Sequence, residues 1–195
     1  MSIQILGGRL KGLPVSIAKG ATLRPTSVIL RRKLFDRHQV LDDVIFLDCF
    51  CGTGSMGIEA YSRGAEQVCF NDIDSKSLKK LKENLFKISD RLQIPFKDSF
   101  SVAKSKGDRF LSSFSFDRSR ENWIFIDPPY KQVDDYKKCF AVVEDIVSEG
   151  GDFHILIESD KNVLSPEDLN LYNQAPDKIL WHGDHYIASF YFTSD

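Results

Sequence analysis

Two short segments of this 195-residue chain combine residue types that suit chemistry on an amino group. The more specific one is Asp127-Pro128-Pro129-Tyr130, which directly follows the apolar run at residues 123–126. Two consecutive prolines stop a strand and remove two amide donors, so backbone carbonyls beside the acid are left without strand partners. The segment therefore predicts a strand end that presents a carboxylate, carbonyl oxygens and an aromatic ring.

The chemistry expected there follows from the properties of an amino group on a nucleobase. Its nitrogen is a poor nucleophile because the lone pair is delocalised into the ring. Acceptors around its two hydrogens favour a pyramidal nitrogen and direct the lone pair at an electrophilic carbon. The Asp127 carboxylate and the Pro128 carbonyl can act as such acceptors, and Tyr130 offers a face on which an extruded base can stack. The candidate catalytic residues are therefore Asp127, Pro128, Pro129 and Tyr130.

The second segment is a glycine loop, residues 48–57, which follows the apolar run at residues 44–47. Its glycines, Gly52, Gly54 and Gly57, allow a sharp turn and a close approach of backbone to a ligand. Their spacing alone matches a dinucleotide-binding pattern, so a nicotinamide cofactor is an alternative. Asp48 favours S-adenosylmethionine instead, because an acid at this place would repel a pyrophosphate and attract a sulfonium and an ammonium group.

Two further acids are candidates for contacts with the same cofactor. Asp72 follows the apolar run at residues 67–70, and its carboxylate can accept hydrogen bonds from ribose hydroxyls. Asp98 follows an expected third strand near residues 93–96, where a loop in contact with adenine would fall; a plain turn is the alternative reading. The expected cofactor is S-adenosylmethionine, and its candidate binding residues are Asp48, Gly52, Gly54, Asp72 and Asp98.

Strand and helix patterns that could position these segments alternate from residue 42 onward. Short apolar runs predict strands at 44–47, 67–70, 123–126, 153–157 and 186–192, and helical patterns are expected at 56–62, 76–88 and 136–147. Such alternation predicts an α/β fold, a doubly wound and mostly parallel Rossmann-like sheet covered on both faces. Ligands of these sheets bind at the carboxyl ends of strands, where the strand order reverses. We expect residues 42–195 to form this catalytic domain.

Residues 1–41 have a different character and predict a basic extension. The chain carries a net charge of −2, but residues 1–40 hold eight basic side chains and one acidic one. A local basic segment can bring RNA onto a mildly acidic protein, although a solvated terminal arm would look the same. A helix is expected from Val28 to about Gln39, capped by Thr26 or Ser27. The candidate RNA-binding residues are Arg9, Lys11, Arg24 and Arg31.

Other features of the sequence exclude several classes of protein. No apolar run approaches the roughly 20 residues that a membrane helix needs, and the N-terminus lacks the order of a signal peptide. We therefore expect a cytoplasmic monomer with no membrane partner. The four cysteines are expected to be buried free thiols. His182, Asp184 and His185 are read as a polar turn, so no metal is expected.

Several segments together resemble the RsmD-type 16S ribosomal RNA (guanine-N2)-methyltransferases, which have the class I methyltransferase fold. The segments that carry the resemblance are residues 5–12, residues 23–27 with Leu34 and Phe35, residues 47–60, residues 125–130 and residues 157–159. The glycine loop and the 127–130 segment are shared with many amino-methyltransferases. The likeness to enzymes of ribosomal RNA therefore depends on the N-terminal segments.

The resemblance implies that the 127–130 segment holds a guanine of ribosomal RNA or of the small ribosomal subunit. It also implies that Arg24 lies near the active site and that the basic extension binds the RNA. This chain departs from the family after the Arg24-Pro25-Thr26 turn: an Asp-Arg pair and a Val-Arg-Glu are usual, whereas here Val28-Ile29 and Leu30-Arg31-Arg32 follow. The departure removes polar groups that could contact RNA.

Three alternative functions remain open on the sequence alone. An N6-adenine methyltransferase of DNA or RNA would share the 127–130 segment, although no target-recognition domain for DNA is evident in the 195 residues. A nicotinamide-dependent oxidoreductase would share the glycine spacing. A non-catalytic RNA-binding domain would share the basic extension.

Overall fold

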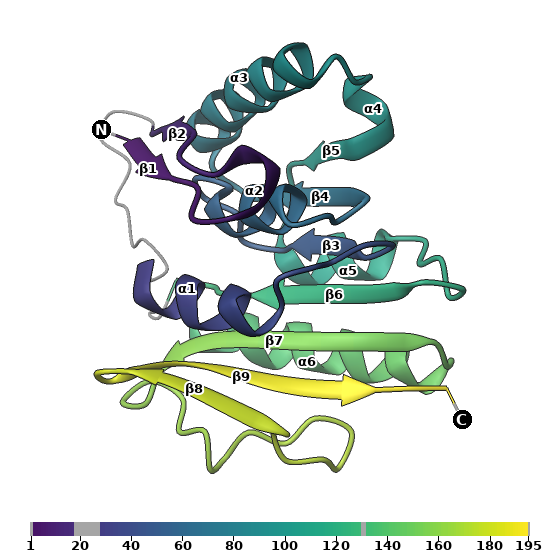
Figure 1. The fold of residues 1–195 in the computed structure, drawn as a ribbon. Coiled ribbons are helices and arrows are strands. Elements are labelled where there is room, and N and C mark those ends of the chain that lie inside the picture. Colours follow the sequence, from purple (N-terminus) through teal and green to yellow (C-terminus); the bar gives the residue numbers. More distant parts are fainter. Residues whose placement is uncertain (1, 18–27, 130–131, 195) are drawn as a thin grey trace.

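The computed structural model describes residues 2–17, 28–129 and 132–194 (Figure 1). Arg24 and Tyr130, two of the expected site residues, lie outside these ranges. The helices are η1 (Gly8–Leu10), α1 (Val28–Arg37), α2 (Ser55–Ser62), α3 (Ser75–Leu92), α4 (Phe96–Ser99), α5 (Gly107–Ser113) and α6 (Val133–Ser148). The strands are β1 (Ser2–Gln4), β2 (Pro14–Ser16), β3 (Ile45–Asp48), β4 (Gln67–Asn71), β5 (Phe100–Ala103), β6 (Glu121–Ile126), β7 (Asp152–Asp160), β8 (Lys178–His182) and β9 (His185–Phe192).

Seven of the described strands form one sheet in the order β5-β4-β3-β6-β7-β9-β8, and β1 and β2 pair separately. Neighbours from β5 to β7 run parallel, and β9 is antiparallel to both β7 and β8. The chain moves outward from β3 through β4 to β5 and then returns to β6 beside β3, so the strand order reverses between β3 and β6. The expected α/β, mostly parallel Rossmann-like fold is confirmed.

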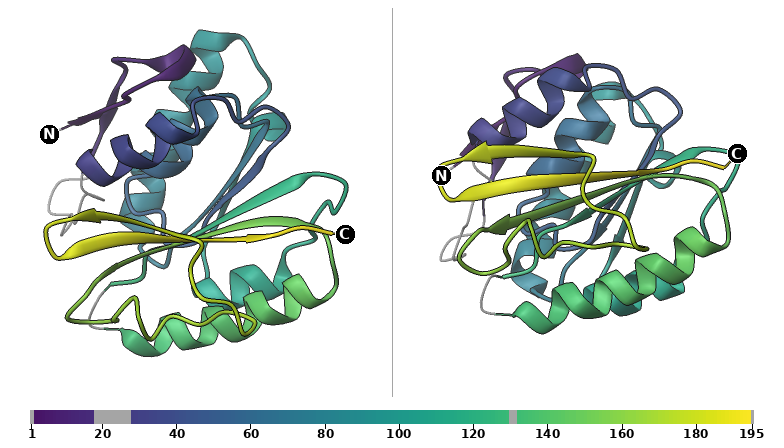
Figure 2. Two further views of the ribbon diagram at one scale, coloured as in Figure 1. Left: turned by 60° about the horizontal axis from the view of Figure 1, so that its bottom comes forward. Right: turned by 90° about the horizontal axis from the view of Figure 1, so that it is seen from below.

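Helices cover both faces of this sheet (Figures 1 and 2). On one face, α1, α2 and α3 contribute to a hydrophobic cluster; on the other, α5 and α6 contribute to a second cluster. Ile5, Leu10 and Val15 of the N-terminal segment are buried in the first cluster. The described part of the basic extension therefore shares its core with the sheet.

The central strands form where the sequence has short apolar runs because those residues are buried on both faces. Every residue of β3 is buried, as are the last five residues of β6. In α3, Leu78, Leu81, Leu85 and Ile88 are buried at helical spacing. The Asp74 carboxylate begins this helix by accepting hydrogen bonds from the Lys76 and Ser77 amides.

The third strand lies later in the sequence than expected. Residues 93–96 follow the end of α3, where Gln93 adopts a left-handed conformation with φ of 54°. The strand itself is β5, Phe100–Ala103, on the edge of the sheet. Only Phe100 of this strand is buried, so its hydrophobic signal is weak. The short elements β1, β2, β8, α4 and α5 were not predicted either.

The sequence predicts buried free cysteines and no membrane-spanning helix. All four cysteines are free and buried, as expected. None of the described helices combines the length and the apolar character needed to cross a membrane.

His154, near the start of β7, is a buried histidine that should make stability depend on pH. Its ring stacks on Tyr191 and contacts the edge of Trp123, both at 4.1 Å between ring centroids. Neither ring nitrogen has a hydrogen-bond partner among the described residues. Burial, and secondarily the neighbouring His38, lowers the pKa of His154 from 6.5 to about 3. The imidazole is therefore neutral in the folded protein at every pH above that value.

Because the unfolded chain binds this proton near pH 6.5, the contribution to stability is complete above pH 6.5 and is lost as the pH falls toward 3. Between pH 7 and pH 5 we expect His154 to account for a loss of about 2 kcal/mol of unfolding free energy. Urea unfolding of the wild type and of His154→Leu at both pH values checks this. A variant that loses as much stability as the wild type over this interval would contradict the assignment.

Candidate active site

The loops that follow β3, β4, β5 and β6 converge on a cavity of about 590 Å³ at the carboxyl edge of the sheet. This is the size of a small-molecule site, and it lies where the strand order reverses. Its lining includes Asp48, Phe50, Cys51, Gly52, Thr53, Ser55 and Met56 after β3, Asp72, Ile73, Asp74 and Ser77 after β4, Ser105, Lys106 and Gly107 after β5, and Asp127, Pro128, Pro129, Gln132 and Asp135 after β6. The two motifs singled out in the sequence thus face one cavity.

The glycine loop begins α2 at the wall of the cavity. Gly52 and Gly54 have φ of 49° and 75°, a region that residues with a Cβ rarely adopt. A Cβ on Gly54 would also lie 2.4 Å from Leu81 Cδ1, whereas one on Gly52 would meet no atom within 4 Å. Gly54 is therefore required by packing against α3, and Gly52 leaves open space beside the loop.

Asp48 is a buried acid of the cavity with a strongly raised pKa. Its side chain is 1% exposed, and its Oδ2 accepts a hydrogen bond of 3.1 Å from the Gly57 amide. Burial raises the pKa of Asp48 to about 8, and the charges of Asp127 and Asp72 raise it further, against the effect of the Gly57 hydrogen bond. A group of this kind, strongly perturbed within a cavity, is a typical functional candidate.

The lining as a whole is acidic. It includes five aspartates, whereas Lys106 is the one cationic residue among its described members. The low dielectric of a partly enclosed cavity strengthens the effect of these carboxylates on a ligand. The site therefore suits a cationic ligand and disfavours a pyrophosphate.

Asp72 connects the end of β4 with the glycine loop. Its Oδ2 accepts a hydrogen bond of 2.8 Å from the Gly52 amide, and its Oδ1 accepts one of 2.8 Å from the Asp74 amide. These bonds fix the carboxylate at the rim of the cavity. The next residue, Ile73, is 59% exposed and gives the same rim an apolar surface.

Asn71 is a supporting residue that the sequence analysis missed. It is fully buried, and its Nδ2 donates to the carbonyls of Cys49 and Ser105 at 2.9 and 3.1 Å. Its Oδ1 accepts from the Ser105 amide and hydroxyl, each at 3.0 Å. One side chain thus ties together the ends of β3, β4 and β5. The sequence signal that could have identified Asn71 is its position between the apolar run at residues 67–70 and Asp72.

The segment after β6 lies directly beside the glycine loop. Asp48 pairs in register with Phe125, and the Cys49 amide donates to the Phe125 carbonyl at 3.0 Å. Two residues later, Asp127 and Pro128 line the cavity. The Pro129 carbonyl accepts a hydrogen bond of 2.7 Å from the Gln132 amide, whereas no bond to the Pro128 carbonyl is found within the described ranges. This leaves the Pro128 carbonyl available to a ligand.

The structure contradicts the expected role of Asp98. This residue is exposed in α4, before β5 begins, and it does not line the cavity. Parallel strands bring together the residues after their carboxyl ends, so a residue before β5 lies at the opposite edge. Ser105 and Lys106, which follow β5, occupy the place that had been expected for Asp98.

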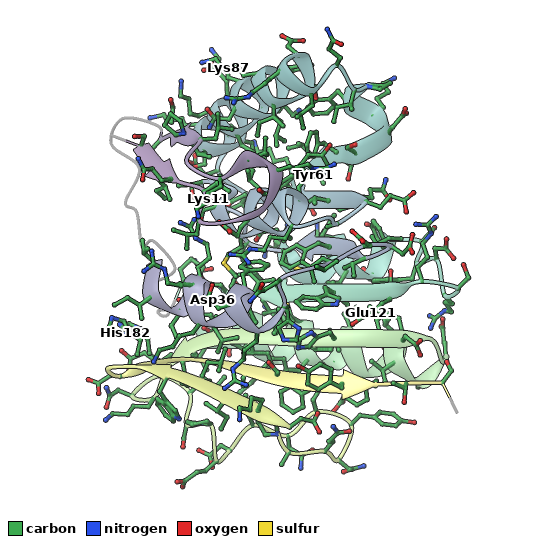
Figure 3. The ribbon with its side chains drawn as sticks, viewed as in Figure 1. Lys11, Asp36, Tyr61, Lys87, Glu121 and His182 are labelled. Carbon is green, nitrogen blue, oxygen red and sulfur yellow. The ribbon has the colours of Figure 1, made fainter. Side chains whose placement is uncertain are left out.

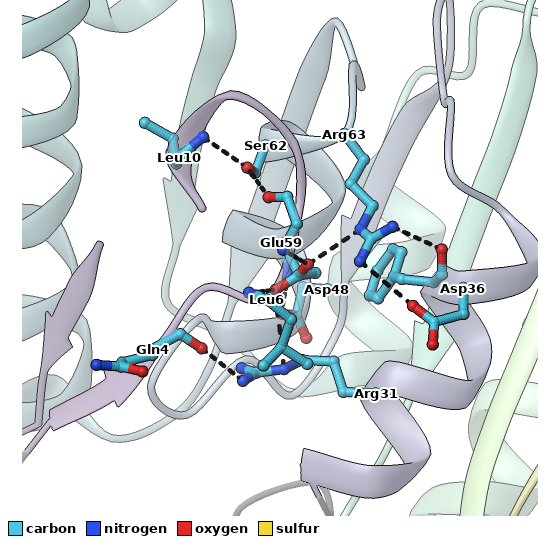
Figure 4. A network of polar contacts seen from close by, with 12 residues as sticks. Gln4, Leu6, Leu10, Arg31, Asp36, Asp48, Glu59, Ser62 and Arg63 are labelled. Carbon is cyan, nitrogen blue, oxygen red and sulfur yellow. Dashed lines mark hydrogen bonds and ion pairs between the residues drawn. The ribbon is translucent and has the colours of Figure 1, made fainter. Parts of the chain in front are cut away.

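The structure also contradicts the expected role of Arg31. Its side chain is 1% exposed and donates to the Gln4 carbonyl at 2.8 Å. Its Nε lies 4.0 Å from Glu59 Oε2, so the guanidinium contacts the protein interior and is not available to an RNA surface (Figure 4).

Arg9 and Lys11, two other expected RNA-binding residues, are exposed. The Arg9 guanidinium lies 3.9 Å from the centroid of the Tyr61 ring.

Glu59 of α2 is the centre of the network in Figure 4. Its carboxylate is fully buried and accepts hydrogen bonds from the Leu6 amide at 2.8 Å, the Gly7 amide at 2.9 Å and Arg63 Nε at 3.0 Å. Together with Arg31, these contacts attach the segment between β1 and η1 to the sheet domain. Nothing in the local sequence distinguished this glutamate from a solvated helix residue.

The turn between β8 and β9 contains His182, Asp184 and His185, which the sequence predicts to form a polar turn. Asp184 pairs with Lys161 at 2.8 Å, and His185 Nδ1 lies 4.0 Å from Asp160 Oδ2. Within residues 2–17, 28–129 and 132–194, no group of three or more histidines, cysteines or acids is arranged to hold a metal ion.

Comparison with known proteins identifies the family. The family model described as Conserved hypothetical protein 95 matches residues 3–182. The chain belongs to this family. Ribosomal RNA small subunit methyltransferase D of Buchnera aphidicola (Acyrthosiphon pisum) is 29% identical over 175 residues, which are 88% of this chain and 86% of the relative. The Escherichia coli K12 protein of the same name is 30% identical over 131 residues, 67% of this chain and 61% of the relative. The expected resemblance to the RsmD-type family is confirmed.

A solved structure agrees with the family in its fold. The Escherichia coli protein yhhF superimposes with a TM-score of 0.74 over the full length of both chains, at 21% identity.

Proposed function

We propose that this member of the family transfers a methyl group from S-adenosylmethionine to the exocyclic N2 of a guanine in small-subunit (16S) ribosomal RNA. The observation that carries the proposal is the acidic cavity between the ends of β3 and β6, which Asp48, Asp72 and Asp127 line together. The names of the relatives support the ribosomal RNA as substrate.

The cofactor assignment rests on charge and shape. Asp48 favours a ligand with a sulfonium and an ammonium, while Asp72 accepts hydrogen bonds from the ribose hydroxyls. Gly52 lets the backbone approach the ligand, and the exposed Ile73 offers the adenine ring an apolar contact. The same acids disfavour the pyrophosphate of a nicotinamide dinucleotide.

In the proposed reaction, Asp127 and the Pro128 carbonyl accept the two hydrogens of the guanine amino group. They aim the nitrogen lone pair at the methyl carbon and stabilise the positive charge that develops on nitrogen. Bound S-adenosylmethionine would supply the methyl group: the new nitrogen–carbon bond would replace its sulfur–carbon bond, with S-adenosylhomocysteine and one amino proton, taken up by water, as the other products. Pro129 fixes the turn, and Tyr130 stacks on the extruded base.

The RNA is held outside the cavity by the basic extension, residues 1–41, with residues 42–195 as the catalytic domain. Arg9, Lys11 and Arg24 are proposed to contact phosphates and so to add a salt-dependent, sequence-independent affinity. The protein is proposed to act as a monomer on ribosomal RNA or on the small ribosomal subunit.

The raised pKa of Asp48 makes cofactor binding depend on pH. With a pKa of about 8, the Asp48 carboxyl is mostly protonated at pH 7. A cationic ligand favours the ionised form, so binding must release this proton. Affinity for S-adenosylmethionine should therefore fall below pH 8, by up to about tenfold per pH unit. Calorimetric titrations at pH 6.5, 7.5 and 8.5 check this, and Asp48→Asn should show a flat profile. A wild-type profile that is equally flat would contradict it.

Transfer of a labelled methyl group tests the proposed function. The wild type is incubated with labelled cofactor and either undermethylated small ribosomal subunits, their extracted RNA, or duplex DNA. We expect label in RNA from subunits or free RNA, as N2-methylguanosine at one position. Label in adenine at N6, or in DNA, would replace the proposal with the alternative methyltransferase.

Ligand-induced stabilisation separates the remaining alternatives. S-adenosylmethionine at about 100 times its Kd should stabilise the fold by about 2.7 kcal/mol and raise the melting midpoint, while NAD should leave it unchanged. A rise with NAD alone would favour an oxidoreductase. No rise with either ligand would favour a non-catalytic RNA-binding domain.

A further inference from the structure

A second hollow of about 550 Å³ lies between α1 and β8, outside the candidate active site. It is lined by Lys33, Asp36 and Arg37 of α1 and by residues 178–181 of β8. We refer to it as the α1–β8 groove. It is formed by segments about 140 residues apart in the sequence, so the sequence alone gave no sign of it.

The charge of the α1–β8 groove is positive in a protein whose net charge is −2. Three cations line it, Lys33, Arg37 and Lys178, against one acid, Asp36. Asp36 lies 3.9 Å from the Arg63 guanidinium, which offsets part of its charge. Neither Arg37 nor Lys178 forms an ion pair with any acid that the structure describes, so both charges are available to a partner.

The groove is held in shape before any partner binds. Lys33 Nζ donates a hydrogen bond of 2.8 Å to the Trp181 carbonyl and so links α1 to the edge strand. Below this link, Leu30, Leu34 and Leu180 are buried in one hydrophobic cluster. Strand alternation places Lys178 on the same face of β8 as Leu180, toward α1. A preformed cationic groove loses little conformational entropy when it binds an anion.

The groove belongs to the same sheet as the cavity, and its β8 side reaches the edge of the sheet at which the cavity lies: Trp181 pairs with Tyr186, which pairs with Ser159 near the end of β7. Because β7 and β8 are both antiparallel to β9, β8 ends at the same edge of the sheet as β6 and β7. Figure 3 shows His182, at the end of β8, on this edge below α1. Three strand spacings separate β6 from β8, about 15 Å in the direction across the sheet.

We propose that the α1–β8 groove binds the phosphate backbone of the RNA substrate, next to the nucleotide held in the cavity. Arg37 and Lys178 contact phosphates, and Lys33 adds charge beside them. Lys33 and Arg37 are one helical turn apart, about 6 Å along α1, a spacing close to that of successive phosphates on one strand. This inference rests on the proposed function and replaces Arg31, which is buried, with exposed cations of α1 and β8.

The test compares two double charge reversals of equal size. Arg37→Glu/Lys178→Glu changes the groove, and Lys82→Glu/Lys87→Glu changes the exposed face of α3, whose Lys87 lies at the far end of the molecule from His182 in Figure 3. Lys33 is kept because it bonds to β8. Circular dichroism and the affinity for S-adenosylmethionine establish that both variants are folded.

Binding of fluorescently labelled small-subunit RNA is then measured as a function of salt. The groove variant should show a Kd at least about tenfold higher at moderate salt, and the slope of log Kd against log salt should fall by about 2. The α3 variant should stay within about twofold of the wild type. Equal losses in the two variants, or none in the groove variant, would overturn the inference.

Two other outcomes of the binding experiment can be told apart from these. If the groove variant loses affinity for intact subunits but not for extracted RNA, the groove binds a ribosomal protein and the inference is wrong. If the groove variant behaves as expected in RNA binding while the wild type transfers no methyl group to any RNA, the inference about RNA holds and the proposed function fails.

Discussion

Replacing Asp127 with alanine is expected to lower kcat for methyl transfer by about 100-fold or more while the affinity for S-adenosylmethionine changes little. Asp127 lines the cavity two residues after Phe125, which pairs with Asp48 in the sheet. In the proposed reaction, loss of its carboxylate removes one acceptor from the amino group and one charge that stabilises the transition state. Removal of a single preorganised group of this kind typically costs 10²- to 10³-fold in rate.

The measurement is single-turnover transfer of a labelled methyl group to undermethylated small subunits, together with calorimetric titration of the cofactor. Asp134→Ala is the matched control, because Asp134 is an exposed acid in the first turn of α6 and does not line the cavity. Its rate should equal that of the wild type. A wild-type rate for Asp127→Ala would remove this residue from the catalytic group.

The second large effect is expected at Glu59. We predict that Glu59→Ala lowers the free energy of unfolding by about 3–5 kcal/mol, the usual cost of removing one partner from a buried charged pair. The buried carboxylate accepts two backbone amides of the N-terminal segment and the Nε of Arg63, and it lies beside Arg31. Its loss leaves these buried donors unsatisfied and an arginine without its counter-charge.

Denaturant unfolding of the wild type and the variant checks this value. Glu83→Ala is the control, since Glu83 pairs with Lys80 on the exposed face of α3 and should leave the midpoint nearly unchanged. Partial proteolysis adds a local readout: Glu59→Ala should expose residues 2–17 to cleavage before the sheet domain. Equal stability of the two variants would show that the Figure 4 network does not hold the N-terminal segment in place.

The central part of the fold could be predicted because its strands are buried on both faces. β3 and β6 therefore appear as short uninterrupted apolar runs, and the residues that follow them had to meet at one edge of a parallel sheet. Sequence reasoning therefore predicts that Asp48, Gly52, Asp72 and Asp127 lie close together, and all four line the cavity.

The sheet edges were less predictable. β5 and β8 are edge strands with mixed exposure, so their patterns are weak. The sequence pattern predicts the third strand too early, and so it also predicts Asp98 at the wrong edge of the sheet. Its correct counterparts, Ser105 and Lys106, carry no motif of their own.

The polar contacts between distant segments could not be predicted at all. Arg31 has the sequence context of an exposed basic residue, and only the packing of α1 against α2 shows that it faces Glu59. The same packing turns Lys33 and Arg37 outward. The total charge of a basic segment can be counted from its sequence. Which of its cations are exposed to RNA depends on long-range contacts, which the sequence does not reveal.

We propose that one cavity holds the methyl donor and the amino group side by side. The most direct measurement is a crystal structure of the protein with S-adenosylhomocysteine. It should place the ribose hydroxyls on Asp72, the amino-acid ammonium toward Asp48 and the sulfur toward Asp127 and Pro128. A ligand bound away from the glycine loop, or with its sulfur directed away from Pro128, would contradict the account.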